Sequence, residues 1–407
     1  MMKILCFLLL YFLVLSVSAQ SLLPLNYDTL ENNSRIEFHG SAFHHSASLR
    51  NDFTGKFIFG GEITDEIKDN SFENHDSFQS VGGEITGELS YYHDTLRGSD
   101  KLAWMLRGGS TVQFGANYPK DLFGLAMYGN QKYLDEPIRL SNLQSFLMHF
   151  SKFGVGVYSK KTKSSISLNA ILVHDYFKLN SGNTTIRTNT ETGFTDIVAD
   201  VIFDQLVSDA TPGIGVGLDI DYYLPITNEG LFEGFVQLTA RNIGAAYFDQ
   251  INRTDMLGGY RYEGILLNEI PNLFEDNGAS FIEEIKDSLN FNEISSGRWV
   301  ALPGFVQVGK IVDGMSDKQL QYFFGVRAYI NAIFRPMAYF GGQYAISNNF
   351  HLGGNISYGG YGNFRGGIYA GYQMNKLAIY AGTEDLTGSF LSSAFGRSAV
   401  LRLNWSL

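Results

Sequence analysis

The chain has 407 residues, with 30 Lys and Arg against 41 Asp and Glu, so its formal net charge is −11. Because the chain is acidic and its basic residues are scattered, it lacks the positive surface that a nucleic-acid-binding protein needs. It also has 45 Gly, 32 Phe and 23 Tyr against 8 Pro and 3 Trp. This composition suits a tightly curved sheet with aromatic residues at a membrane interface.

The N-terminal residues have the pattern of a secretory signal peptide. A short basic start ending at Lys3 precedes an apolar run over residues 4–14, which is too short to cross a bilayer comfortably. Small residues ending at Ala19 predict cleavage after that residue, so we expect a signal peptide over 1–19. Cys6 lies inside the apolar run, so the mature chain is expected to have no disulfide.

Apolar residues recur at every second position in most of the remaining chain. A period of two places alternate side chains on opposite faces of an extended strand. Strands with one apolar and one polar face, joined by tight turns, are what a transmembrane β-barrel requires: the apolar face contacts lipid and the polar face lines the lumen. In chain order, strands are predicted over residues 35–42, 53–63, 81–91, 102–114, 153–157, 166–176, 212–223, 232–240, 305–312, 320–334, 350–358, 364–372, 377–381 and 399–407.

The last predicted strand ends at Leu407, with Trp405 close to its end. In lipid this strand must pair with the first, because an open edge would leave backbone N–H and C=O groups without partners. The sequence therefore predicts an all-β fold: one antiparallel transmembrane β-barrel over 20–407, with about 14 strands (range about 12–16).

Three segments interrupt the alternation and are predicted to be short helical or plug-like insertions. They cover about 116–142, 194–208 and 257–298. The first predicts a loop or an inward-folded segment. The second has apolar residues at helical spacing and predicts a helix, and the third predicts a short amphipathic helix around Ile285. Residues 65–76 are predicted to be a charged loop.

Two groups of residues were considered as metal ligands. Asp196, Asp200 and Asp204 lie one turn apart on the predicted helix, where such a row is more often a solvated stripe than a cation site. His44 and His45 are adjacent in a predicted strand and would point to opposite faces. We therefore predict no metal site.

Catalytic and cofactor motifs are absent from the sequence: Gly-x-Ser-x-Gly, His-Glu-x-x-His, a P-loop and Cys-x-x-Cys do not occur. The sequence predicts a protein that is not an enzyme, with no catalytic residue and no cofactor. Charged residues on inward strand faces are predicted to form structural ion pairs in a wet lumen. They are Glu84, Glu88, Asp219, Asp221 and Glu233, with Arg107, Arg241, Arg327 and Arg365.

Four short stretches occur in an order that resembles a known family. They are Asp121-Leu122-Phe123 with Tyr128-Gly129-Asn130, Ala240-Arg241-Asn242-Ile243-Gly244, Ala301-Leu302-Pro303, and residues 380–386 with Gly396-Arg397-Ser398. The second resembles a turn at the end of a strand. The chain resembles an uncharacterised, DUF-designated family of outer-membrane barrels from Bacteroidota, which is similar to FadL-type channels for hydrophobic compounds and to the PorV protein of type IX secretion. The resemblance implies about 14 strands and supplies no catalytic residue.

The expected function is to bind, pass or present a cargo in the cell outer membrane. The expected partners are outer-membrane lipid and either a hydrophobic small molecule or proteins of a secretion system. A hydrophobic-solute channel predicts a continuous apolar path from loop to lumen, whereas a secretion- or motility-associated barrel predicts a plugged lumen and an exposed patch on a loop. The alternative is a soluble secreted β-rich adhesin or binding protein, whose outward faces a second sheet would cover.

Overall fold

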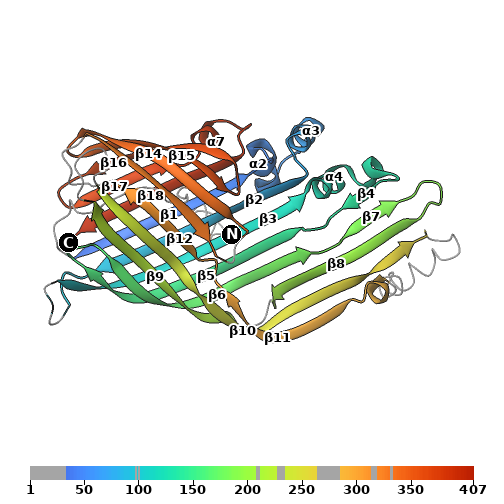
Figure 1. Cartoon of the computed structure of the whole chain (residues 1–407), viewed down its shortest axis with the longest axis horizontal. Helices are drawn as coiled ribbons and strands as arrows, with labels where there is room; N and C mark the ends of the chain where they lie inside the picture. The colour runs from blue at the N-terminus through green and yellow to red at the C-terminus, as the bar shows by residue number, and fades with distance from the viewer. Residues whose placement is uncertain are drawn as a thin grey trace, which may run out of the picture.

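The computed structural model describes residues 34–96, 99, 101–207, 211–226, 234–263, 285–312, 319–330 and 333–407, and the predicted signal peptide lies outside them. One antiparallel sheet closes into a barrel (Figure 1). Fourteen strands form the ring, which confirms the predicted fold and number. In ring order they are β1 (Arg35–Ser46), β2 (Phe78–Tyr92), β3 (Leu102–Pro119), β5 (Gln144–Ser159), β6 (Ser165–Ser181), β9 (Gly213–Ile226), β10 (Gly234–Tyr262), β12 (Phe305–Ile311), β13 (Leu320–Tyr329), β14 (Arg335–Ser347), β15 (Phe350–Gly360), β16 (Phe364–Gln373), β17 (Leu377–Thr383) and β18 (Gly396–Ser406).

The first and last strands close the ring. β1 and β18 are antiparallel neighbours from Arg35 opposite Ser406 to His45 opposite Gly396. This pairing satisfies the backbone groups that an open edge would leave without partners. The predicted pairing of the terminal strand with the first is confirmed.

Side chains alternate between the outer wall and the lumen. In β9, Ile214 and Val216 are 68% and 57% exposed, whereas Asp219 and Asp221 are 1% and 6% exposed. Large apolar residues are exposed on the other strands too, including Leu89, Phe153, Leu168, Val326, Ile356 and Ile368. Exposed aromatic residues flank this apolar band at both ends, as expected of a membrane barrel. They are Tyr222, Tyr344, Tyr372 and Trp405 at one end, and Tyr247, Trp299, Tyr358 and Phe364 at the other.

The two ends of the barrel differ in their connections. At one end, which we call the turn end, β14 and β15 are joined by two residues, Asn348 and Asn349. The opposite end, which we call the helical end, carries the long connections (Figure 1). Its helices are α2 (Asn51–Phe59), α3 (Asp65–Glu73), α4 (Lys120–Tyr128), the 3-10 helix η1 (Asn130–Tyr133) and α7 (Leu386–Phe390). No helix in the described ranges is long and apolar enough to cross a membrane.

One side of the barrel extends into a sheet at the helical end, on the right of Figure 1. The long strand β10 supports it, because its first half pairs with β9 and β12 in the ring and its second half pairs with β8 and β11. The added strands are β4 (Pro137–Arg139), β7 (Thr185–Thr188), β8 (Thr195–Leu206) and β11 (Asn292–Ala301).

Two predictions before β2 are wrong. Residues 53–63, predicted as a strand, lie mostly in α2, and the charged loop predicted over 65–76 contains α3. Aromatic packing explains the helix. The rings of Phe53 and Phe57, one turn apart, stack with their centroids 6.0 Å apart, and the Phe53 centroid lies 5.2 Å from that of Phe123 in α4. Gly60 ends α2 at φ +84°, a conformation that glycine adopts without strain. The number of strands is nevertheless correct, because β14 was not predicted.

The helix predicted over 194–208 is also wrong, because Thr195–Leu206 form β8. β8 pairs with β10 from Thr195 opposite Tyr262 to Leu206 opposite Ile251, and it also pairs with β6 and β7. The segment is rich in Val and Ile, which favour strands. These partners are distant in sequence, so local spacing could not reveal them.

The other two predicted insertions are partly confirmed. In 116–142, β3 continues to Pro119 and is followed by α4, η1 and β4. In 257–298, β10 extends to Tyr262 and β11 begins at Asn292, while 264–284 lie outside the described residues. Residues 285–288 are helical, as predicted.

A buried histidine connects the helices at the helical end to the barrel. His75 is 4% exposed, and its Nδ1 lies 2.6 Å from the Ser71 carbonyl oxygen. Its Nε2 lies 3.1 Å from the Tyr118 hydroxyl and 3.2 Å from the Ser48 hydroxyl. Burial lowers the pKa of His75 below its ordinary value, and the nearby charge of Lys120 adds to the effect.

We expect the packing of α3 to weaken in mild acid. A folded-state pKa below the unfolded value means that the unfolded state binds the proton more tightly, so this contribution to stability is full above about pH 6.5 and decreases as the pH falls toward the lowered pKa. The hydrogen-exchange protection factors of residues 65–75, which are the observed rates corrected for the intrinsic rate at each pH, should therefore fall from about pH 7.5 to about pH 5.5. His75→Gln should remove this pH dependence, and an unchanged dependence in that variant would contradict the assignment.

Candidate functional site

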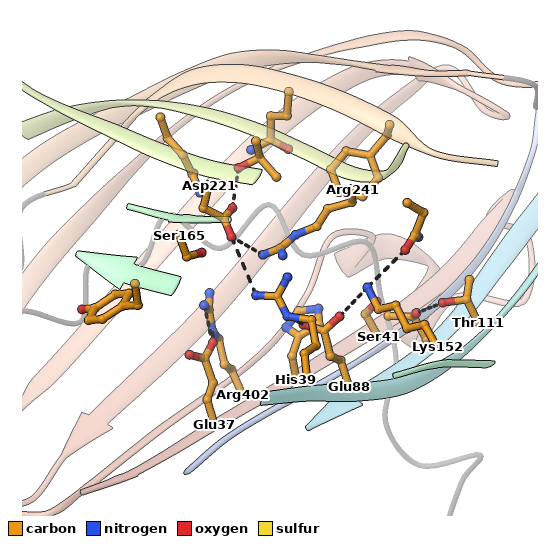
Figure 2. Close-up of a pocket in the computed structure, with 18 of the residues that line it drawn as sticks. Glu37, His39, Ser41, Glu88, Thr111, Lys152, Ser165, Asp221, Arg241 and Arg402 are labelled. Atoms are coloured by element: carbon orange, nitrogen blue, oxygen red, sulfur yellow. Dashed lines mark hydrogen bonds and ion pairs between the residues drawn. The ribbon is translucent and has the colours of Figure 1, made fainter. Parts of the chain in front are cut away.

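The lumen contains a polar cavity surrounding about 1250 Å³ of unfilled space, close to the turn end of the barrel. Strands β1, β2, β3, β5, β6, β9, β10, β12, β13 and β18 contribute to its wall. Figure 2 shows charged side chains from these strands pointing toward one another across the cavity. The inward phase of each strand determines these positions, because every second residue faces the lumen.

Asp219 of β9 is the centre of the charged network. Its carboxylate accepts hydrogen bonds from Arg107 at 3.0 Å, from Lys152 at 2.9 Å and from the backbone N–H of Asn242 at 2.7 Å. A bulge in β10 between Ala240 and Ile243 places Asn242 there, at φ +54°. The stretch predicted to be a turn at a strand end is therefore a bulge inside a strand.

Two further carboxylates complete the network. Glu88 pairs with Arg107 at 3.0 Å and with Lys152 at 2.7 Å. Asp221 pairs with Arg241, as Figure 2 shows. Three carboxylates thus meet three cations, and the network carries no net charge. It joins β2, β3 and β5 to β9 and β10 across the lumen, so it acts as a set of cross-braces.

Smaller contacts line the cavity wall near the turn end. Arg402 donates to Glu37 at 3.0 Å and 2.6 Å. The Arg35 guanidinium lies over the rings of Tyr92 and Tyr158, at 4.1 Å and 4.7 Å from their centroids. In each contact the guanidinium has a partner that compensates for its removal from bulk water: a carboxylate for Arg402 and aromatic ring faces for Arg35.

Among the described residues, every charged residue that the sequence predicts to face inward does face the lumen. Glu84 accepts a hydrogen bond from Tyr329, Arg327 donates to Gln307, and Arg365 lies 3.0 Å from the Met337 sulfur. Only part of the predicted set meets at Asp219, because Arg327 and Arg365 lie on the other side of the ring. Glu233 lies outside the described residues.

Four members of these contacts lie outside the predicted set of paired lumen charges: Lys152, Glu37, Arg35 and Arg402. The strand period nevertheless places Glu37 and Arg402 on the polar faces of their strands. A signal for Lys152 was present. It lies between two outward positions in β5, and Phe153 beside it is 61% exposed. Strict application of the strand period would have placed Lys152 in the lumen.

Apolar side chains fill the lumen toward the helical end. Tyr361, in the β15–β16 connection, is fully buried, and its ring packs against Phe43 and Phe334. Ile333, in the β13–β14 connection, contacts this group and also a larger cluster on β5, β6 and β10 that includes Phe150. These two connections therefore fold inward and occupy space in the lumen toward the helical end.

The aspartates and histidines considered as ligands do not meet in one site. Asp196 pairs with Arg261, Asp204 pairs with Arg298, and Asp200 accepts from the Asn183 backbone N–H. Among the residues that the structure describes, no group of three or more His, Cys, Asp or Glu side chains could hold a metal ion.

No family model matches the chain, and no curated protein matches it. Among solved structures, it is similar to the toluene transporter TodX of Pseudomonas putida, at 8% identity and a TM-score of 0.37, covering 96% of this chain and 93% of that one.

It is also similar to the toluene transporter TbuX of Ralstonia pickettii, at 8% identity and a TM-score of 0.37, covering 92% and 90% of the two chains. A third similar structure is the translocator domain of the autotransporter NalP from Neisseria meningitidis, at 10% identity and a TM-score of 0.31, covering 93% and 91%. The fold assignment rests on the strand pairing of this chain.

Proposed function

We propose that the protein is a β-barrel of the bacterial outer membrane that presents a cargo or a partner protein at its helical end and keeps its lumen closed. The exposed apolar band between two aromatic zones supports placement in a membrane. The outward faces carry no second sheet in the described part of the chain, which favours this function over a soluble adhesin. Because membrane barrels have short periplasmic turns and longer outer loops, the helical end faces the outside of the cell.

The filling of the lumen by inward side chains is the observation that carries the proposal. The Asp219 network spans one part of the lumen, and the group around Tyr361 fills the part nearer the helical end. A hydrophobic solute that enters from the helical end would therefore meet the three carboxylates and three cations of this network. Adjacent to this end, α2 exposes Phe57, Ile58 and Phe59, which form an apolar patch of the kind expected for a presenting barrel. A protein of a secretion or motility machinery is the partner class we propose.

A hydrophobic-solute channel is the second candidate. The cluster of Phe146, Phe150 and Phe248 supports it, because these side chains lie on inward strand faces near the helical end. This function requires the inward connections to move and the charged network to rearrange.

Two measurements test the proposal. After extraction from the outer-membrane fraction, unboiled protein should migrate differently on a gel from boiled protein, because a closed barrel resists unfolding by detergent until it is heated. In liposome swelling, the purified protein should admit small sugars no faster than protein-free liposomes. Recovery in the soluble fraction without a mobility shift would contradict the membrane barrel, and rapid swelling would favour the channel.

A further inference from the structure

A serine, a histidine and an aspartate form a hydrogen-bonded row on the outer wall of the barrel. The Ser110 hydroxyl of β3 lies 3.2 Å from Nε2 of His149 on β5. Nδ1 of His149 lies 3.1 Å from a carboxylate oxygen of Asp175 on β6. The other contact of the Ser110 hydroxyl, to the Phe150 carbonyl oxygen, is longer at 3.4 Å.

A bulge in the β5–β6 pairing produces this arrangement. His149 pairs with Asp175, but the next residue, Phe150, pairs with Val173, so His174 is an extra residue in β6. The bulge turns the β6 backbone locally and leaves His174 and Asp175 both next to His149, with the two histidine rings 4.7 Å apart. Regular alternation would place only one of these two consecutive residues on the outer wall.

The row has the order of groups that activates a serine for acyl transfer. A serine hydroxyl is a weak nucleophile until a histidine nitrogen accepts its proton. A carboxylate on the other ring nitrogen holds the imidazole in the required tautomer and stabilises its cation. Because Asp175 occupies the Nδ1 side of His149, Nε2 is free to accept the Ser110 proton. Sequence motifs missed the row, since its members come from three strands.

The row is a group of polar side chains on an otherwise largely apolar part of the outer wall. Along β5 the outward residues Val155 and Phe153 are 56% and 61% exposed, and Ser151 and His149 follow toward the helical end. Along β6, Leu168 and Leu172 are followed by His174 and Asp175. Toward the helical end apolar outward residues follow again, Leu147 on β5 and Phe177 on β6. A glycerolipid that contacts this lipid-facing wall can therefore reach the row.

A hollow that is open to the outside lies beside the carboxylate end of the row. Its wall includes both His174 and Asp175. The rest of its wall combines the apolar residues Leu147, Phe177 and Leu206 with the polar groups of Tyr176 and Gln205. A lipid whose ester carbonyl lies at Ser110 thus has a partly apolar hollow close to the carboxylate end of the row.

From these observations we infer that Ser110, His149 and Asp175 form a catalytic site that hydrolyses an acyl ester bond of a membrane glycerolipid. This activity goes beyond the presenting role, and it rests on the proposed placement in a membrane. Ser110 is the nucleophile, His149 is the general base and acid, and Asp175 orients His149.

The reaction balances with water as the second substrate. The Ser110 oxygen attacks the ester carbonyl carbon while His149 takes the hydroxyl proton. The bond to the glycerol oxygen breaks, His149 protonates that oxygen, and the lipid leaves as a lysolipid. Water then attacks the acyl-serine, His149 takes a proton from the water, and Ser110 regains its proton as the fatty acid leaves.

The test uses the purified full chain in mixed micelles of detergent and dioleoyl phosphatidylcholine, with fatty-acid release as the readout. Ser110→Ala and His149→Ala should each lower the rate by about 10³-fold or more, and Asp175→Asn should also lower it strongly. A fluorophosphonate probe should label the wild type at Ser110, as located by mass spectrometry, and should not label Ser110→Ala.

Ser151→Ala is the matched control, because Ser151 is the residue opposite Ser110 in the β3–β5 pairing and its hydroxyl contacts His174 instead. It should keep the wild-type rate. Each variant is first checked for the mobility shift on heating. Absent fatty-acid release and absent labelling in protein that shows the shift would overturn the inference and leave the barrel intact, as would equal rates for Ser110→Ala and the wild type. Loss of the shift in the wild type would instead contradict the proposed membrane barrel.

Discussion

Asp219→Ala is expected to destabilise the barrel by about 3–5 kcal/mol, the usual cost of breaking a buried ion pair by removing one partner. Asp219 is 1% exposed and accepts hydrogen bonds from Arg107 and Lys152. Removing its carboxylate leaves three cations with only Glu88 and Asp221 as carboxylate partners in the network. The measurement is denaturant unfolding of the protein in lipid vesicles, compared with the wild type.

Asp196→Ala is the matched control for this prediction. Asp196 also pairs with an arginine, Arg261, but the two side chains are 45% and 57% exposed on the projecting sheet. Water and salt screen such a pair, so the unfolding midpoint should stay at the wild-type value. If the Asp219 and Asp196 variants unfold at the same denaturant concentration, the lumen network does not brace the barrel.

Tyr361→Ala is expected to destabilise the protein by about 3–5 kcal/mol, as for other large aromatic residues replaced in a core, and also to open the helical end of the lumen. Tyr361 is fully buried. A methyl group at Gly82 or Gly115 would come within 2.5 Å or 2.6 Å of its ring, so the ring rests directly on the backbone of β2 and β3. Liposome swelling with small sugars should be faster for the variant than for the wild type.

Tyr358→Ala provides the comparison, because Tyr358 belongs to the same hairpin but is 62% exposed on the outer wall. Its loss removes an aromatic residue from the membrane interface and leaves the lumen filled, so swelling should match that of the wild type. Equal swelling for Tyr361→Ala and the wild type would place the barrier to solutes elsewhere, with the Asp219 network as the next candidate.

Two different elements obstruct the lumen, and the two variants remove one each. The charged network holds together the strands from β2 to β10 on one side of the ring, and the inward connections fill the space toward the helical end. A presenting barrel needs both to stay in place while a partner binds outside. A hydrophobic-solute channel would need the Tyr361 group to move during transport, so a variant without that side chain also tests the second candidate.

The sequence determined the barrel, its lipid-facing residues and most of its lumen charges. Alternation is a local property of each strand, and it assigns a face to every residue once the strand is recognised. It therefore placed Ile214 outside and Asp219 inside without knowledge of any partner strand. The same argument failed for α2, where packing of Phe53 on Phe123 decided the structure.

Only the tertiary structure decided which residues meet. Asp219 lies 112 positions from Arg107 and 67 from Lys152, and the cross-strand register and barrel closure bring them together. The helix predicted over 194–208 became β8 for the same reason, since its partners on β10 are distant in the chain. Ser110, His149 and Asp175 meet through the β3–β5–β6 register and one bulge, and a shift of one residue would turn each strand's side chains to the opposite face.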